Sequence, residues 1–393
     1  MYRILSFVFV LFMFVSCGSG YTGIASKPDS DRSSDINDVD YEEVSDTDSD
    51  EVSGPDENPD TGEIPESDEV PESDEIPESD EVSDSDEIPD TDEVPDPDEV
   101  PDPDETDDFD GDSIQIRIVA GNITSGNKQS YDPGHGIRIF QALKPDIALV
   151  QEMNYGNNSV SDYKNFAQEI VGTNYYAVDN KQKCNNNKCN IPNGIVSKYP
   201  ITDSDSWDDP NINDRALLWA IIDIPGEKDI FAVSVHLHTG PESDQVTAAK
   251  LIVDEIAKVK EKNPGKYYYV VGGDFNGDSA VSQNGFGKNN TFYVDGPDPV
   301  DEKGNGNTNA KREKQYDFVL ADHPLHEFQV PVVYYSSEDA TKTKIYENGL
   351  VFDTRLYDQS VLNEYFSPAD QNDSGASQMQ HMAVVKDFLI ELK

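Results

Sequence analysis

The stretch KYYYVVGGDFNGD, residues 266–278, decides the fold. Its first half is an unbroken apolar and aromatic run, which is typical of a strand buried on both faces. Two glycines then let the backbone approach a ligand closely, and Asp274 and Asn276 follow two residues apart. Residues two apart on an extended chain point to the same side. The stretch therefore predicts a buried strand that delivers a carboxylate and an amide to one side of its carboxyl end.

Apolar runs of this kind recur over residues 113–393. Short apolar or alternating runs predict further strands, and two stretches have the spacing of amphipathic helices. We expect strands at 114–120, 146–151, 191–199, 216–224, 229–238, 316–321 and 382–389, and helices at 136–143 and 244–262. Strands outnumber helices, and polar residues stand where several strands end. This pattern predicts two packed sheets with outer helices and a site formed by strand-end loops.

Several of these strand-end residues could carry chemistry, although each has an ordinary explanation when taken alone. Asn122 follows the first strand, where it would read as a turn residue. Glu152 follows an apolar run, where a carboxylate can simply cap the strand. His236 and His238 share one face of a strand, and Asp317 is a lone acid in an apolar run that needs a partner.

Six separated segments, taken together, resemble the DNase I-like endonuclease/exonuclease/phosphatase family. They are VAGNITSG (119–126), PDIALVQE (145–152), SVHLHTG (234–240), VVGGDFNGD (270–278), QYDFVLAD (315–322) and ASQMQHMAVV (376–385). The resemblance implies a four-layer α/β sandwich, in which two packed mixed β-sheets are flanked by helices. It also implies hydrolysis of phosphodiester bonds by in-line attack of an activated water, with Mg²⁺ as the cofactor and Ca²⁺ or Mn²⁺ as alternatives.

The resemblance assigns roles around the metal and the phosphate. Glu152 is implied as the main metal ligand, and Asn122 as a ligand of the metal or the phosphate. Asp274 would orient or deprotonate the attacking water, while Asn276 would hold phosphate oxygens.

The resemblance also assigns roles to the histidines. His236 would contact the scissile phosphate or help to protonate the leaving group, with His238 as a neighbour. Asp317 would pair with His381, fix its ring and favour its charged form. That pair could act as a general base or as a cation facing the transition state.

Arg215 and three further histidines remain to be placed. Arg215 precedes a strand and is a candidate phosphate clamp, although an exposed arginine is usually only solvated. His135, His323 and His326 match no role in the family and are expected in loops or at the surface.

One motif departs from the family. The closing motif is usually Ser-Asp-His, and this chain has Met379-Gln380-His381. Gln380 can accept a hydrogen bond but cannot supply the negative charge of the aspartate. Either metal affinity is weakened, or the remaining carboxylates hold the metal with an altered preference.

Residues 1–17 have the form of an export signal of the lipoprotein type. Arg3 precedes an apolar stretch too short to span a bilayer, and Cys17 follows a small residue. Phe14 departs from the aliphatic residue that is usual there, and an ordinary cleaved signal is the alternative. We expect an extracytoplasmic protein anchored through lipid on Cys17 to a bacterial membrane, at the periplasmic face of the outer membrane or the cell surface.

Residues 18–112 form a predicted stalk. The first 112 residues hold 40 acidic and 3 basic side chains, which is −37 of the total charge of −50 and leaves −13 for residues 113–393. A six-residue unit such as EVPDPD recurs seven times between Glu63 and Asp104. One isolated apolar residue per unit cannot offset the ordering entropy, so we expect a disordered spacer. A calcium-binding or adhesive repeat is the alternative, but it lacks the spaced ligands of a folded calcium loop.

Cys184 and Cys189 lie in a polar loop, where we expect a disulfide in an oxidising compartment. A zinc site is disfavoured because no further ligands stand nearby.

The substrate follows least directly from the sequence. We expect a monomeric nuclease acting on DNA or RNA, although the domain is acidic and lacks a basic tract. A phosphodiesterase or phosphatase for lipid or small-molecule phosphoesters is the second hypothesis. A non-catalytic surface protein with a decayed site is the third.

Overall fold

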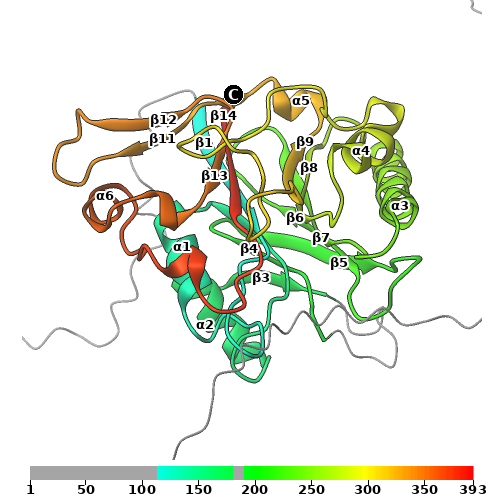
Figure 1. The fold of residues 1–393 in the computed structure, drawn as a ribbon. Helices are drawn as coiled ribbons and strands as arrows, with labels where there is room; N and C mark the ends of the chain where they lie inside the picture. Colours follow the sequence, from blue (N-terminus) through cyan, green and yellow to red (C-terminus); the bar gives the residue numbers. More distant parts are fainter. Residues whose placement is uncertain (1–112, 180–189, 393) are drawn as a thin grey trace, which may run out of the picture. The chain divides into compact units, whose positions relative to one another are not determined.

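The computed structural model describes residues 113–179 and 190–392. Their strands form two large sheets, and helices lie outside them (Figure 1). The larger sheet has the strand order β10-β14-β1-β2-β4-β3, and β13 also pairs with β14. Its strands are β1 (Ser113–Gly121), β2 (Ile147–Val150), β3 (Tyr175–Val178), β4 (Gly194–Ser197), β10 (Gln329–Val330), β13 (Leu350–Phe352) and β14 (Ala383–Glu391).

The smaller sheet has the order β5-β6-β7-β8-β9, in which only β7 and β8 are parallel neighbours. Its strands are β5 (Ile201–Trp207), β6 (Leu217–Ile222), β7 (Asp229–His236), β8 (Tyr267–Asp274) and β9 (Asp317–Ala321). A separate hairpin consists of β11 (Val332–Tyr335) and β12 (Thr343–Tyr346).

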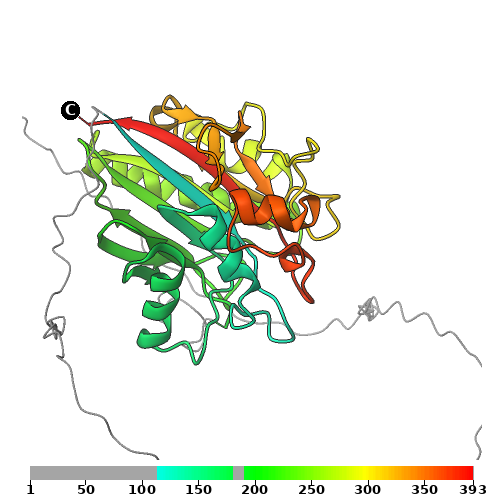
Figure 2. The same cartoon turned by 90° about the vertical axis from the view of Figure 1, so that its left-hand side faces the viewer.

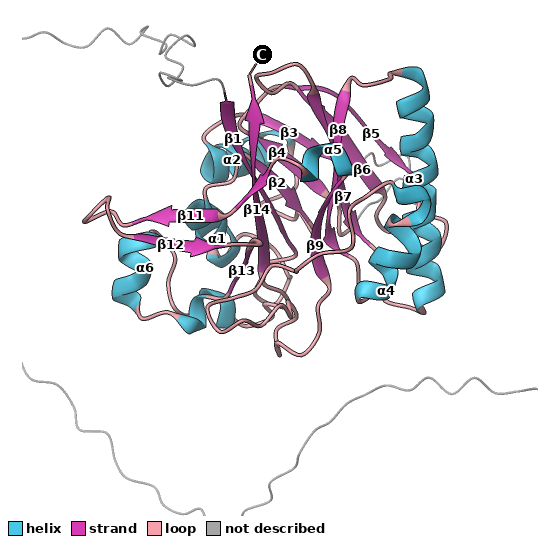
Figure 3. Cartoon of the chain, turned by 90° about the horizontal axis from the view of Figure 1, so that it is seen from above, coloured by secondary structure: helices cyan, strands magenta, loops and turns pink. Residues whose placement is uncertain are grey.

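The helices flank the two sheets on opposite sides (Figure 3). The α-helices are α1 (His135–Leu143), α2 (Val160–Val171), α3 (Glu242–Lys262), α4 (Ser279–Val281), α5 (His323–His326) and α6 (Gln359–Tyr365). Short π or 3-10 turns are η3 (Ser282–Phe286), η4 (Lys288–Asn290), η5 (Thr354–Leu356) and η6 (Asp373–Gly375). Among the described residues, no helix combines the length and the apolar character needed to cross a membrane.

Alternation along β8 explains why the sheets stack. Tyr268 and Val270 belong to the apolar core between the two sheets. Tyr269 and Val271 point the other way, into a second core that includes Ile252 of α3. Both faces of β8 are thus buried, as its apolar sequence predicts. The resulting order of layers, from α1 and α2 through the two sheets to α3, confirms the predicted four-layer α/β sandwich.

A buried ion pair joins the middle of the larger sheet. β1 and β14 run antiparallel side by side (Figure 2), and Arg117 lies opposite Asp387. The Arg117 guanidinium donates to both Asp387 carboxylate oxygens at 2.8 and 2.7 Å. It also donates to the carbonyls of Leu143, at the end of α1, and Val333, in β11. One side chain therefore ties the sheet to its covering helix and to the hairpin.

All the strands and helices predicted from the sequence are present, with ends shifted by a few residues. The elements missed are α2, β3, β5, the short helical turns between 279 and 290, and the elements between 323 and 375. Cys17, Cys184 and Cys189 lie outside the described residues, so the lipid anchor and the disulfide stay predictions.

We expect Arg117→Met to lower the free energy of unfolding by about 3–5 kcal/mol, because it leaves the Asp387 carboxylate buried without its partner. Urea unfolding of the full chain measures this. The control is Lys198→Met, since Lys198 is half exposed and lies 3.9 Å from Asp146. Surface pairs contribute about 0–1 kcal/mol. Equal and small losses in both variants would contradict the role given to Arg117.

Candidate active site

Three ionisable side chains stand in one row across the smaller sheet. His236 ends β7, Asp274 ends β8 and Asp317 begins β9. The strand register pairs His236 with Asp274 and Asp274 with Asp317. All three side chains are buried. The row is a direct consequence of the register, because a shift of one residue would turn these side chains to the other face.

The larger sheet contributes the other half of the site. Asn122 follows β1, and its amide nitrogen donates to Glu152 Oε1 at 3.3 Å and to Asp274 Oδ2 at 3.2 Å. Thr124 donates from its hydroxyl to Glu152 Oε2 at 3.0 Å. Burial raises the pKa of the Glu152 carboxyl, against the lowering effect of these two hydrogen bonds. Asn122 thus links carboxylates that come from the two sheets.

The backbone is constrained where these side chains are presented. Glu152 and Asn276 have φ values of 50° and 48°, in the left-handed region that non-glycine residues rarely occupy. Gly273 has φ 134°, and a Cβ there would lie 2.1 Å from the carbonyl oxygen of Val235. Only glycine fits at 273. Strained residues of this kind persist where the surroundings hold them, and they gather at functional sites.

The predicted Asp317–His381 pair is present. His381 Nδ1 lies 2.6 Å from Asp317 Oδ2, and its Nε2 lies 3.4 Å from Asp274 Oδ2. Burial alone would lower the pKa of His381, but the charges of Asp274 and Asp317 outweigh it and raise that pKa to about 10. His381 is therefore an imidazolium cation at neutral pH, held between two carboxylates.

His236 has the opposite electrostatics. Its Nε2 lies 3.4 Å from Asp274 Oδ2, and its Nδ1 lies 3.9 Å from Glu152 Oε1. Burial lowers its pKa to about 3, and the charges of Arg215 and His381 act in the same direction. One carboxylate thus stands between a neutral imidazole and a charged one, an arrangement that separates two proton-handling roles.

Arg215 does not point into the site as a phosphate clamp. Its guanidinium is buried and donates to the backbone carbonyls of His236 at 2.6 Å and Leu237 at 2.9 Å. It also pairs with Asp214 at 3.1 Å. The prediction of a clamp is corrected: Arg215 fixes the end of β7, because its donors are taken by the carbonyls of the last residue of that strand and of the residue that follows it.

Asn276 lies at the edge of this cluster. Its amide donates to the carbonyl of Leu237 at 2.9 Å, and its own carbonyl accepts from Gln245 at 2.6 Å. His238 turns away and pairs with Asp244 at 3.1 Å. Gln245 of α3 therefore supports the loop after β8, and His238 belongs to that support.

Thr308 is a functional candidate that the sequence did not reveal. It is fully buried, and its hydroxyl accepts from the backbone amides of Tyr316 and Asp317, both at 2.9 Å. Its carbonyl accepts from the amide of Met382, next to His381. Thr308 thus fixes both members of the Asp317–His381 pair. A threonine in a loop rich in asparagine and glycine gave no signal of this role.

Gln380 and the remaining histidines lie outside the cluster. Gln380 is exposed, and its carbonyl accepts from the amide of Ala310 at 2.6 Å. His135 bonds to Asp373 beside α1. His323 and His326 belong to the short helix α5. None of the three joins the site, but they lie half-buried in the helices α1 and α5 and not in loops as expected.

A sequence model described as the Endonuclease/Exonuclease/phosphatase family matches residues 127–339, which is more than half of the chain. The chain belongs to this family. Membership implies a hydrolase that acts on phosphoester bonds, and enzymes of the family typically use divalent metal ions. No curated protein sequence matches the chain.

Solved structures of the family resemble this chain at low identity. TDP2 from Caenorhabditis elegans is 16% identical, over 70% of this chain and 74% of that chain, with a TM-score of 0.43. A family protein from Bacteroides thetaiotaomicron is 13% identical, over 71% and 99%, with a TM-score of 0.41. Sphingomyelinase C from Streptomyces griseocarneus is 14% identical, over 70% and 98%, with a TM-score of 0.42. At identities this low, the likeness does not indicate the substrate of this chain.

The residues present fit the divalent metal that the family implies. Asn122 Oδ1 is buried and has no hydrogen-bond partner among the described residues. The same side chain contacts the Glu152 carboxylate through its Nδ2, and amide and carboxylate oxygens are the ligands that Mg²⁺ prefers. Ligand atoms of Asp274, Asp317 and His381 also lie within 4.8 Å of one another, but the short His381–Asp317 bond already satisfies two of them. Asn122 and Glu152 are thus the better candidates.

We expect the two histidines to titrate far apart. In metal-free protein, His381 should keep its proton up to about pH 10, and His236 should stay neutral down to about pH 3. Because the folded-state pKa of His381 exceeds its ordinary 6.5, the stabilisation is complete below pH 6.5 and is lost as pH rises towards 10. NMR titration of the imidazole protons measures both values. Asp317→Asn should lower the pKa of His381. Titration of both histidines near their ordinary pKa of about 6.5 would contradict this assignment.

We expect Thr308→Val to lower kcat with little change in KM, because two buried amides lose their acceptor, at a cost of about 1–3 kcal/mol. The pKa of His381 should fall as its contact with Asp317 loosens, which a loss of stability alone would not cause. Thr308→Ser keeps the hydroxyl and should restore both properties. Thr247→Val, on the exposed surface of α3, is the matched control. An unchanged kcat and His381 titration in Thr308→Val would refute the positioning role.

Proposed function

We propose that this chain is an extracytoplasmic, metal-dependent phosphodiesterase whose substrate is DNA or RNA. The observation that carries the proposal is the cluster in which His236 and His381 both lie 3.4 Å from the same oxygen of Asp274. Such a site can orient a water, hold a phosphate and face its developing charge with a fixed cation.

Each residue of the cluster has a separate role in hydrolysis. Asp274 orients the attacking water and takes its proton at a carboxylate oxygen. As the new P–O bond forms, the bond to the leaving oxygen breaks, and that oxygen takes up a proton from solvent. His381, fixed by Asp317, faces the charge of the pentacovalent transition state as a cation and not as a base, because its pKa is raised to about 10. His236, kept neutral by burial, donates a hydrogen bond to the phosphate. Asn122 and Glu152 would hold the divalent ion, which when bound supplies positive charge to polarise the phosphoester.

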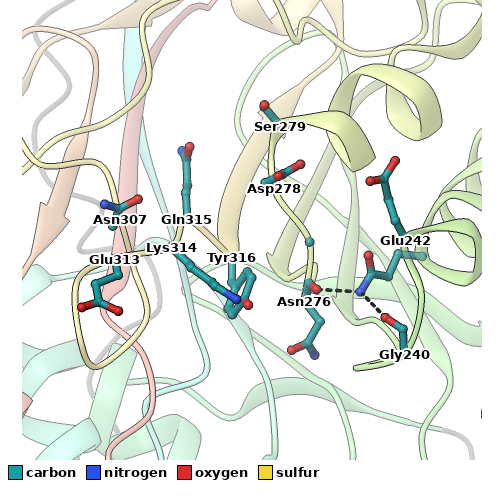
Figure 4. A pocket seen from close by; sticks show the side chains of 12 residues that line it. Gly240, Glu242, Asn276, Asp278, Ser279, Asn307, Glu313, Lys314, Gln315 and Tyr316 are labelled. Atoms are coloured by element: carbon teal, nitrogen blue, oxygen red, sulfur yellow. Dashed lines mark hydrogen bonds between the residues drawn. The ribbon is translucent and has the colours of Figure 1, made fainter.

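Two hollows beside the site support a diester over a monoester. The first has a volume of about 470 Å³ and is lined by Asn276 and Tyr316, among others (Figure 4). The second has about 520 Å³ and is lined by Gln380, and it shares Glu313, Lys314 and Tyr316 with the first. A diester carries a substituent on each side of the phosphorus, and two adjoining hollows offer room for both.

The second hollow supports a nucleic acid. Lys311 and Lys314 line it, and cationic side chains favour the phosphates of a polymer. The ammonium of Lys314 lies 5.7 Å from the centre of the Tyr316 ring. An aromatic ring with a neighbouring cation is a common platform for stacked bases.

The first hollow favours a second candidate, a diesterase or phosphatase for small polar phosphoesters. Glu242, Asp278 and Glu313 line it, against the single cation of Lys314. In Figure 4, Asp278 and Ser279 lie across the hollow from Asn307 and Glu313. Carboxylates repel a further phosphate but accept hydrogen bonds from hydroxyl or amino groups. This lining suits a neutral or hydroxylated substituent better than a lipid tail.

We include the predicted lipid anchor at Cys17 in the proposal. With the stalk over residues 18–112, it would hold the enzyme at a membrane but away from the lipid surface. The support for this part is the sequence of the first 112 residues alone.

We expect the full chain to cleave plasmid DNA or RNA with Mg²⁺, Mn²⁺ or Ca²⁺ and to lose activity in EDTA. His381→Ala should lower kcat by about 100-fold or more, since it removes the cation that faces the transition state. His135→Ala is the matched control, because His135 lies outside the cluster.

The substrate panel adds sphingomyelin, bis-p-nitrophenyl phosphate and p-nitrophenyl phosphate. Turnover of the small esters without nucleic acid would replace the nuclease with the second candidate. No metal-dependent turnover of any phosphoester would refute the enzyme and favour a non-catalytic surface protein.

A further inference from the structure

A third hollow lies away from the catalytic cluster, under the loop that follows η4. It has a volume of about 190 Å³ and is lined by residues that include Tyr293, Asp298, His326, Gln329 and Lys386. Lys386, in β14, follows His381 by five residues, about 17 Å of extended chain at roughly 3.4 Å per residue. The hollow shares no lining residue with either hollow of the catalytic site.

The unusual feature of this hollow is the Lys386 ammonium. Lys386 is only 8% exposed, and within the described part of the chain its ammonium has no hydrogen bond and no ion pair within 4.0 Å. The Asp298 carboxylate lies near enough to favour its charge but does not pair with it. Burial nevertheless lowers the pKa of Lys386 to about 8. A lysine that lines a hollow with its three donors unpaired among the described residues can serve an anionic ligand.

The walls of the hollow offer both donors and acceptors. His326 stacks on Tyr293, with ring centres 3.5 Å apart and planes at 11°. Burial lowers the pKa of His326, and the charge of Lys386 acts in the same direction. Gln329 Oε1 is buried, and the interaction of Gln329 with the His326 ring opposes the lowering of that pKa. The polar groups that line the hollow with Lys386 thus include a neutral imidazole, a carboxylate and the amides of Gln329 and Asn348.

The size of the hollow limits the ligand. One water molecule needs roughly 15 Å³ of cavity volume, so the hollow has room for more than one or two waters. Pockets for larger organic ligands begin at about 300 Å³, so it is too small for a nucleotide. The ligand must be compact, must carry negative charge for Lys386 and must offer a hydrogen to Asp298 or Gln329.

We propose that the Lys386 hollow binds a small oxyanion that carries a hydroxyl group, of which hydrogen phosphate is the representative. Lys386 and the His326 imidazole donate to the anionic oxygens. The Asp298 carboxylate or Gln329 Oε1 accepts from the single hydroxyl. This site is independent of the proposed catalytic function, since it uses none of the same residues.

Protection of the Lys386 amine from acetic anhydride tests the proposal. The full chain is treated at pH 8 in EDTA, with increasing inorganic phosphate at constant ionic strength, and acetylation is followed by peptide mass spectrometry. Lys386 should be protected saturably, by roughly tenfold when phosphate is ten times its dissociation constant. Lys262, at the end of α3, serves as the internal control and should be unaffected. Acetate, which lacks the hydroxyl, should protect Lys386 less.

Two variants separate this site from the catalytic one. In His381→Ala the protection of Lys386 should persist, whereas phosphate held only at the catalytic cluster would lose its effect. Lys386→Met should abolish the phosphate binding seen by calorimetry in EDTA, while Lys262→Met should not. If Lys386→Met fails to fold, Gln329→Leu replaces it and should weaken binding. Absence of saturable protection, or equal protection of Lys262, would overturn the proposal.

Discussion

The register of β8 is the constraint on which the rest of the structure depends. Every residue of β8 is buried, and its alternate side chains fill the two cores of the sandwich. The same register aligns Asp274 with His236 on one side and with Asp317 on the other. Because side chains alternate, a slip of one residue would place Asp274 in an apolar core and break both cores at once. Packing of the sheets and assembly of the site are therefore one requirement.

The sequence predicted what depends on buried apolar strands and the residues that end them. Its segments located the eight main strands, the four layers and the cluster from Asn122 to His381, because burial leaves a clear apolar pattern. It missed β5, whose polar, mostly exposed residues give no such pattern. The sequence did not predict the roles of Arg215 and Thr308, for another reason. Their roles depend on backbone carbonyls and amides brought near by the fold, and sequence spacing carries no record of those contacts.

Electrostatics explains why two histidines in one cluster are not equivalent. Both are buried, and burial alone disfavours the charge on each. His381 has a direct hydrogen bond to Asp317. His236 has no hydrogen-bonded carboxylate, and the positive charge of Arg215 lowers its pKa further. The carboxylate partner decides the outcome, so His381 is charged and His236 neutral. Arg215 thus contributes twice, by fixing the β7 carbonyls and by opposing a second imidazolium beside the first.

The departure at Gln380 bears on how a substrate would be oriented. Gln380 is exposed and lines the hollow that also holds Lys311 and Lys314, so an aspartate there would have offset their charge. The adjoining hollow keeps its carboxylates, among them Glu242 and Asp278. The two sides of the site therefore differ in sign within a domain whose net charge is −13. An anionic substituent is drawn to the lysine side, and a neutral or hydroxylated one is better tolerated on the other. This difference in charge would favour one orientation of a diester in the proposed site.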